Sequence, residues 1–185
     1  MTLTPKKTGW IEVICGPMFS GKTEELIRRL VRAQIARQRV AIFKPNTDNR
    51  FSGDYIVSHN KRKIKSVQVK HTDTILDYRD KADVFGIDEA QFFDNSIVEV
   101  CRSLAISGKR VVVAGLEKDY LAKSFGPMPE LLVDAEYITK VNAICMSCGD
   151  PANFSQRISN ETIQVVVGET DKYEARCRKC FSPIN

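Results

Sequence analysis

Apolar residues along the chain gather in short runs, and several of the stretches between these runs carry apolar positions at helical spacing. The short runs predict strands at residues 10–15, 40–44, 83–88, 110–115 and about 135–141. The helical spacing predicts helices at residues 22–38, 74–80 and 95–107. Short, nearly all-apolar strands that alternate with helices are typical of a parallel sheet covered on both faces. The pattern therefore predicts an α/β fold around a central, mostly parallel sheet.

Two segments depart from this pattern. Residues 55–69 alternate apolar and polar side chains, as an exposed antiparallel hairpin does. After Asn142 the chain changes to cysteines and short strand-like segments at 153–158 and 162–167. We therefore expect a second, smaller domain at the C-terminus. The predicted division is a flexible N-terminus at 1–9, an α/β domain at 10–141 and a C-terminal domain at 142–185.

The composition is that of an ordinary globular protein. Of the 185 residues, 43% are hydrophobic and 28% are charged, and this length suffices for one α/β domain with a small addition. No apolar run approaches the roughly 20 residues of a membrane span. Residues 1–9 lack the apolar core of a signal peptide, so we expect a cytoplasmic protein without membrane contact. The net charge of +5 suits a polyanionic ligand but is weak for a dedicated nucleic-acid binder, so no nucleic-acid partner is expected.

Residues 16–23 match the phosphate-binding (P-loop) pattern G-x-x-x-x-G-K-[ST], between a predicted strand and a predicted helix. In such a loop, backbone N–H groups surround a polyphosphate and the next helix points its positive end at the same anion. Lys22 is expected to reach the β- and γ-phosphates, and the Thr23 hydroxyl to bind Mg²⁺. The sequence thus predicts a nucleoside triphosphate site at Gly16, Pro17, Met18, Phe19, Ser20, Gly21, Lys22 and Thr23.

Two carboxylates, Asp88 and Glu89, end the predicted strand at 83–88. The carboxyl ends of strands line the ligand crevice of an open α/β sheet. Asp88 is therefore expected to bind Mg²⁺ together with Thr23, because this hard cation prefers oxygen ligands. Glu89 is the candidate base. An ATPase results if Glu89 activates water and a kinase results if it activates a substrate hydroxyl, and the acids alone leave both open.

Four cysteines form two C-x-x-C pairs in the C-terminal part of the chain: Cys145, Cys148, Cys177 and Cys180. Four thiolates complete a tetrahedral zinc site and leave no position for water, so the predicted zinc is structural. The segment between the pairs is longer than in a compact zinc ribbon. It is therefore expected to form a loop that the metal ties at its base, and such a loop is a candidate lid.

Several strings together carry a family resemblance: G-P-M-F-S-G-K-T at 16–23, D-E-A-Q-F-F at 88–93, G-L at 115–116, S-F-G-P at 124–127, D-K-Y-E-A-R-C-R at 171–178 and both cysteine pairs. With them the chain resembles the zinc-containing family of thymidine kinases of bacteria and the animal cytosol, from about Trp10 to Cys180. The resemblance implies transfer of the γ-phosphoryl group of ATP to the 5′-hydroxyl of thymidine or deoxyuridine, with Mg²⁺. The products are the nucleoside monophosphate and ADP, in nucleotide salvage.

The resemblance also implies roles around the phosphates. Glu89 matches the family's base and would take the proton from the 5′-hydroxyl, and Lys22 would act on the phosphates. Asp48 and Arg50 match an Asp-x-Arg element near the phosphates, where Arg50 would offset charge on the transferred group. Gln91, in the same string as Glu89, is assigned to the nucleotide site by this match.

For the nucleoside, the resemblance implies an aromatic pocket with Phe92, Leu116, Tyr120, Phe125 and Tyr173, and with Ser155 near the thymine methyl group. An ordinary core or structural position is the alternative for Tyr120, Phe125, Ser155 and Tyr173. The lid residues would read thymine largely with main-chain groups: Gln164, Val165, Val166, Val167 and Gly168. Cytosine has the opposite donor and acceptor order on this edge, so we expect deoxyuridine to be accepted and deoxycytidine to be rejected.

Three other functions share some of these sequence features. A nucleic-acid-dependent ATPase with a zinc ribbon shares the loop, the acids and the zinc, but 185 residues cannot hold the two motor domains of a helicase. A kinase of the same fold for another small hydroxyl substrate is the second alternative. A nucleotide-gated binding module without turnover is the third, and the intact Lys22 and Glu89 argue against it. The family resemblance further implies a homotetramer and feedback inhibition by thymidine triphosphate.

Overall fold

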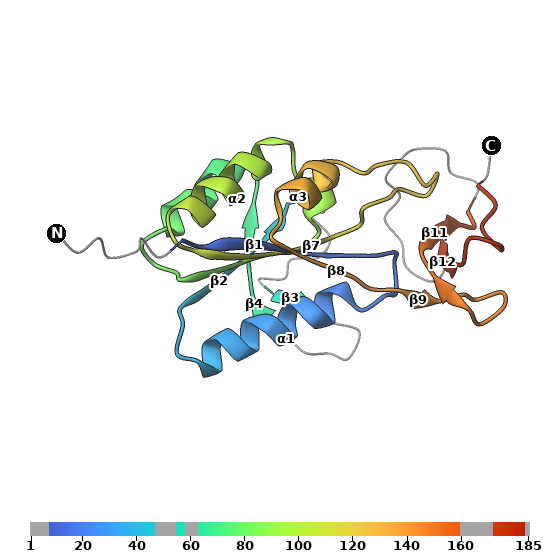
Figure 1. Ribbon diagram of the computed structural model, residues 1–185, viewed down its shortest axis with the longest axis horizontal. Helices are drawn as coiled ribbons and strands as arrows, with labels where there is room; N and C mark the ends of the chain where they lie inside the picture. The colour runs from blue at the N-terminus through green and yellow to red at the C-terminus, as the bar shows by residue number, and fades with distance from the viewer. Residues whose placement is uncertain (1–7, 47–54, 58–62, 160–171, 184–185) are drawn as a thin grey trace.

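The computed structural model describes residues 8–46, 55–57, 63–159 and 172–183, and at 55–57 and 63 only the backbone. Figure 1 shows a central sheet with helices on both faces and a smaller group of strands beyond one end. The helical segments are α1 (Lys22–Ile35), α2 (Ser96–Ile106), α3 (Met128–Asp134) and the 3₁₀ segments η1 (Thr72–Tyr78) and η2 (Ala90–Phe92). In Figure 1, α1 covers one face of the sheet, and α2 and α3 cover the other. This arrangement confirms the predicted α/β fold.

Within the described residues the central sheet has six strands in the order β5-β2-β6-β7-β1-β8, and every neighbouring pair is parallel. The bounds are β1 (Trp10–Cys15), β2 (Val40–Pro45), β5 (Val67–Val69), β6 (Val84–Ile87), β7 (Arg110–Gly115) and β8 (Tyr137–Lys140). All five predicted strands are present. Because the strands run in one direction, their carboxyl ends meet at one edge of the sheet, where ligands bind in such folds.

The two faces of the sheet bury different sets of apolar side chains. Ile14 and Val112 face α1 and pack with its Leu26 and Leu30. The alternate positions of the same strands pack against α2 and α3 in a second, larger cluster. Burying one such aliphatic side chain stabilises the fold by roughly 1.5–3 kcal/mol. The fit to α1 is close, since a Cβ at Gly86 would lie 2.6 Å from a Leu30 methyl carbon.

The predicted hairpin at residues 55–69 is correct only in its first part. β3 (Tyr55–Val57) and β4 (Lys63–Lys65) pair antiparallel, as expected. The hairpin strand β4 ends at Lys65, and buried Ser66 separates it from β5. β5 then joins the central sheet parallel to β2. Burial of Val69 in the larger apolar cluster accounts for this change of partner. In addition, the helix predicted at 74–80 is the 3₁₀ segment η1, and α3 was not predicted.

Among the described residues of the C-terminal part, two antiparallel strand pairs form. Their strands are β9 (Ala143–Ile144) with β10 (Pro151–Ala152), and β11 (Phe154–Arg157) with β12 (Tyr173–Arg176). The strand predicted at 162–167 lies outside the described residues. None of the helices in the described part of the chain has the length and apolarity that a bilayer span requires.

Candidate functional site

The loop between β1 and α1 has the backbone shape that the P-loop pattern predicts. Gly16 and Gly21 have φ angles of 150° and 82°, in the region that favours glycine. At Gly16 the absence of a side chain is also a steric requirement, since a Cβ would lie 2.2 Å from the carbonyl oxygen of Val141. Phe19 takes a left-handed conformation with φ 63°. Such strained backbone in a non-glycine residue is concentrated at ligand sites.

Lys22 folds back over this loop. Its Nζ donates a hydrogen bond to the carbonyl oxygen of Pro17 at 2.7 Å. Burial lowers the pKa of Lys22, and the carboxylates of Glu89 and Asp88 oppose that shift. A polyphosphate in the loop would supply further negative charge beside this ammonium group and favour its charged form.

Asp88 and Thr23 meet at the end of β6. The Thr23 hydroxyl lies 3.3 Å from Asp88 Oδ2 and donates toward this carboxylate, which is only 6% exposed. Burial raises the pKa of Asp88 to about 7, and the neighbouring charge of Glu89 adds to this effect. A hydroxyl beside a buried carboxylate that needs a compensating cation is a donor set that fits Mg²⁺. Thr23 and Asp88 are therefore the residues that would hold this ion.

Glu89 is exposed next to this pair and takes a left-handed backbone conformation with φ 52°. Its Oε2 accepts a hydrogen bond of 2.5 Å from Gln91 Nε2, and Gln91 Oε1 in turn accepts one of 2.9 Å from the backbone N–H of Leu116. The amide of Gln91 is buried, so it holds Glu89 in a fixed position relative to β7. A strained backbone and a fixed carboxylate beside a metal-ligand set are typical of a catalytic base.

Two glycines allow Gln91 to sit in this position. A Cβ at Gly115 would lie 2.9 Å from Gln91 Oε1, and a Cβ at Gly126 would lie 2.3 Å from the carbonyl oxygen of Gln91. Gly126 also has a φ of 51°. The glycines of the G-L string at 115–116 and the S-F-G-P string at 124–127 thus leave room for Gln91. The sequence predicts Gln91 in the nucleotide site, and in the structure it contacts Glu89.

The aromatic residues expected around the nucleoside fall into two groups. The rings of Phe92 and Phe125 meet edge to face, with 5.6 Å between their centroids. Tyr120 and Tyr173 are joined through Arg157, whose Nη2 donates a hydrogen bond of 2.7 Å to the Tyr173 hydroxyl. Sequence reasoning missed Arg157, because one arginine in a short, mostly polar strand carries no signal of burial.

Ser155 connects the C-terminal part to the P-loop. Its Oγ accepts a hydrogen bond of 2.9 Å from the backbone N–H of Met18. Lys118 makes a second connection by donating to the carbonyl oxygen of Asn153 at 2.9 Å. The strand pair β11–β12 is therefore fixed to the end of the sheet where the phosphate loop and the acids lie. The remaining predicted site residues, Asp48, Arg50 and 164–168, lie outside the described residues.

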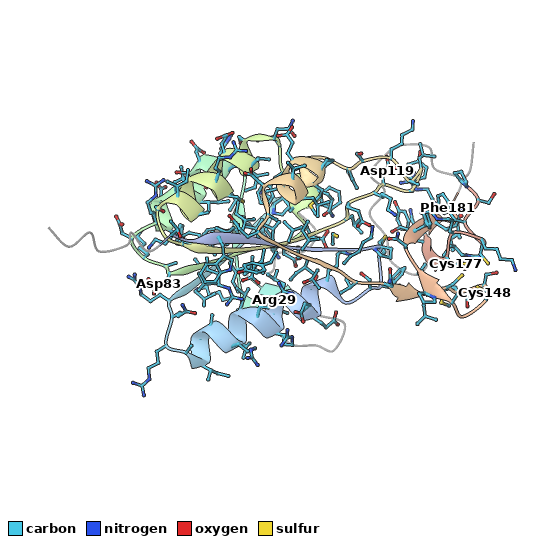
Figure 2. All side chains as sticks on the ribbon, in the orientation of Figure 1. Arg29, Asp83, Asp119, Cys148, Cys177 and Phe181 are labelled. Carbon is cyan, nitrogen blue, oxygen red and sulfur yellow. The ribbon has the colours of Figure 1, made fainter. Side chains whose placement is uncertain are left out.

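The four cysteines of the two C-x-x-C pairs gather at one point. Their Sγ atoms all lie within 4.8 Å of one another, and those of Cys148 and Cys177 are 3.6 Å apart. Zinc–sulfur bonds of about 2.3 Å in a tetrahedron give sulfur–sulfur distances of about 3.8 Å, so the cluster fits a zinc ion. Figure 2 shows Cys148 and Cys177 at the end of the molecule away from Asp83. The predicted four-thiolate site is thus supported by the geometry.

Comparisons with known proteins identify the family of the chain. A profile of the thymidine kinase family matches residues 9–181. The chain is 58% identical over 175 residues to a thymidine kinase of Rhodothermus sp., covering 95% of this chain and 82% of that protein. It is 52% and 51% identical to thymidine kinases of Bacteroides thetaiotaomicron and Bacteroides fragilis, over 95% of this chain and 88% of each relative. With a match over nearly its whole length, the chain belongs to the thymidine kinase family.

Proposed function

We propose that this protein is a thymidine kinase, which transfers the γ-phosphoryl group of ATP to the 5′-hydroxyl of thymidine and also accepts deoxyuridine. The observation that carries the proposal is the meeting of Thr23, Asp88 and Glu89 at the carboxyl edge of the sheet, in a chain of this family. Phosphoryl transfer depends mainly on positioning and on stabilising charge, and these residues supply both.

In this proposal residues 16–23 bind the triphosphate, and Lys22 lies against its β- and γ-phosphates. Mg²⁺, when bound by Thr23 and Asp88, supplies positive charge beside the phosphate oxygens. Asp48 and Arg50 act on the same phosphates.

Glu89 is proposed as the general base. Its carboxylate takes the proton of the 5′-hydroxyl as the 5′ oxygen bonds to the γ-phosphorus, and the bond from that phosphorus to the β–γ bridging oxygen breaks. The proton ends on Glu89, and ADP leaves with the bridging oxygen. Gln91 supports this step because its buried amide holds the Glu89 carboxylate.

The nucleoside is proposed to bind between the aromatic groups and the lid. The residues concerned are Phe92, Leu116, Tyr120, Phe125, Ser155, Tyr173 and 164–168. Main-chain groups of the lid would match the donor and acceptor order of thymine and leave buried groups unpaired against cytosine. Structural zinc at the four cysteines supports this arrangement, because Cys177 directly follows β12, which carries Tyr173.

Further features are proposed from the family resemblance. We propose a homotetramer in the cytoplasm, with feedback inhibition by thymidine triphosphate, whose thymine would fill the nucleoside pocket while its phosphates reach the P-loop. We also propose the division of the chain into a P-loop domain at 10–141 and a zinc-binding lid domain at 142–185. The hydrogen bond from Val141 N–H to Cys15 O, at 2.8 Å, ties the end of the first of these domains to the start of the P-loop.

A nucleoside panel tests the proposed function. ADP release from ATP–Mg²⁺ is measured for the purified protein alone and with thymidine, deoxyuridine, deoxycytidine or single-stranded DNA. We expect release with thymidine and deoxyuridine, matched by monophosphate product, and none above background with deoxycytidine. Stimulation by DNA without nucleoside phosphorylation would instead identify an ATPase, with Glu89 acting on water.

A further inference from the structure

The phosphate-binding loop is in contact with the C-terminal part of the chain, although the proposed division places the loop in the first domain. The ring of Phe19 packs against a small apolar cluster. The buried members of this cluster come from β9, β10, β12 and both cysteine pairs: Ala143, Cys145, Ala152, Ala175 and Cys177. In Figure 1 the loop between β1 and α1 turns beside β9. The loop therefore has neighbours in both of the proposed domains.

The side chain of Phe19 is large, whereas those of the cluster are small. The buried members of the cluster are three alanines and two cysteines. In the described part of the chain, two partly buried side chains pack against them, Cys180 and Phe19, and of these only Phe19 carries a ring. Protein interiors are close-packed, and a large side chain gains dispersion contacts with every atom around it. The ring of Phe19 is therefore a strong link between the loop and the C-terminal part.

A hydrogen bond fixes the residue before Phe19 to the same part of the molecule. The backbone N–H of Met18 donates to the Oγ of buried Ser155 on β11, at 2.9 Å. Lys118, which follows β7, donates to the carbonyl oxygen of Asn153 at 2.9 Å and so holds the start of β11. Met18 and Phe19 are thus restrained by two different kinds of contact, one polar and one apolar.

The backbone of Phe19 has a conformation that needs such restraints. Its φ of 63° lies in the left-handed region, which is unfavourable for a residue with a bulky side chain. Such a conformation persists only where the surrounding structure holds it. The loop is expected to bind phosphate with backbone N–H groups, and their directions depend on the φ and ψ angles at this position. The contacts of Phe19 and Met18 therefore bear directly on phosphate binding.

We propose that Phe19 is a positioning residue for ATP, whose ring, packed against the C-terminal cluster, keeps the P-loop in its phosphate-binding shape before ATP arrives. The glycine pattern determines which shape the loop takes, and the contact of Phe19 raises the fraction of the ligand-free protein that has this shape. The inference rests on the proposed function, in which residues 16–23 bind ATP. It makes the ATP site dependent on the C-terminal part as well as on the α/β domain.

The test measures ATP–Mg²⁺ binding by calorimetry in the wild type, Phe19→Ala and Phe19→Leu. Phe19→Ala is expected to raise the Kd for ATP about tenfold or more, because only about a tenth of the free protein would keep the binding shape. Phe19→Leu keeps an apolar contact and should stay within about threefold of the wild type. In steady-state kinetics Phe19→Ala should raise the KM for ATP, while kcat and the KM for thymidine change less than about threefold.

Two further variants separate the ring from the backbone. Phe19→Gly removes the ring but adopts a positive φ without strain, so it should bind ATP as weakly as Phe19→Ala. Binding of ATP by Phe19→Gly as tight as that of the wild type would overturn the role of the ring. Ser155→Ala removes the acceptor of the Met18 N–H and should raise the Kd for ATP about two- to tenfold, as the loss of one hydrogen bond does.

Phe181→Ala is the matched control. Phe181 is also partly buried in the C-terminal part, and its ring stacks on that of Phe154 with 4.6 Å between the centroids. Its replacement should lower the melting temperature and leave the Kd for ATP within about twofold of the wild type. A rise as large as that of Phe19→Ala would mean that any loosening of the C-terminal part weakens ATP binding. That result would overturn the specific role of Phe19, as would equal rises of the two KM values in Phe19→Ala.

The two proposals fail in different ways. A wild-type protein that binds ATP but phosphorylates no nucleoside would contradict the proposed function, and the calorimetric comparison would still test the inference. Unchanged ATP binding by Phe19→Ala, in a protein that phosphorylates thymidine, would overturn the inference alone. A wild type that binds no ATP would overturn both. If Phe19→Ala does not fold, Ser155→Ala carries the comparison, and an unchanged Kd for ATP in that variant would overturn the inference.

Discussion

Replacement of Asp88 by asparagine should make the ligand-free protein more stable at alkaline pH. Burial, followed by the charge of Glu89, raises the pKa of Asp88 from 3.8 to about 7. A carboxyl whose pKa is raised on folding stabilises the fold fully below its unfolded pKa, and this contribution is lost as the pH rises through the folded pKa. The ionised carboxylate therefore destabilises the protein above pH 7 when no cation is bound. Asparagine has the same shape, can still accept from Thr23 and carries no charge.

The size of this stability difference follows from the pKa shift of Asp88. A rise of about three pH units corresponds to about 4 kcal/mol, at about 1.4 kcal/mol for each unit. This figure is an upper limit, because Asp88 and Glu89 titrate as a pair. We expect the free energy of unfolding of Asp88→Asn to be about 1–4 kcal/mol higher than that of the wild type at pH 8.5. At pH 5 the two free energies should differ little.

The assay is urea unfolding of both proteins at pH 5 and pH 8.5, without Mg²⁺ or nucleotide and without a chelator, so that the proposed zinc site is left intact. Asp83→Asn is the control, because the Arg39 guanidinium holds the pKa of this exposed carboxyl below its usual value. Its replacement should be neutral or slightly destabilising at both pH values. A difference between Asp88→Asn and the wild type that does not vary with pH would refute the reasoning, as would a more stable wild type at pH 8.5.

Three further changes test other parts of the site. Glu89→Gln should keep nucleotide binding and lower turnover about 100- to 10,000-fold, and near-normal turnover would remove Glu89 as the base. Cys177→Ser should lose zinc, measured by metal analysis, and should weaken thymidine binding more than ATP binding in calorimetry; equal losses would mean that zinc supports the whole fold. Gly126→Ala should lower the melting temperature, because its Cβ would lie 2.3 Å from the Gln91 carbonyl oxygen, and an unchanged melting temperature would show that the loop adapts.

The sequence predicts well those elements whose structure is determined by residues close together in the chain. The P-loop has a fixed spacing of glycines, lysine and threonine, and its backbone shape follows from that spacing alone. The strands β1, β6 and β7 are mostly apolar and buried because both faces of the sheet are covered there, whereas β8 lies at the edge of the sheet and is largely exposed. Each C-x-x-C pair is also recognisable from its spacing in the sequence, and the fold brings the two pairs together.

The elements that were missed depend on distant partners. β5 alternates apolar and polar residues like a hairpin strand, and only its pairing with β2 decides its direction. α3 is too short to show a helical period, with seven residues including Pro129. The hydrogen bond between Gln91 and the Leu116 backbone, and the one between Arg157 and Tyr173, join residues that are distant in the sequence, so local spacing does not reveal them.

Transfer of label from ATP to thymidine tests the central claim most directly. The protein is incubated with Mg²⁺, γ-labelled ATP and thymidine, and the products are separated for the wild type and for Glu89→Gln. We expect label in thymidine monophosphate with the wild type, in amounts equal to the ADP formed, and almost none with Glu89→Gln. Label released as free phosphate, or product formed equally well by Glu89→Gln, would contradict a kinase that uses Glu89 as its base.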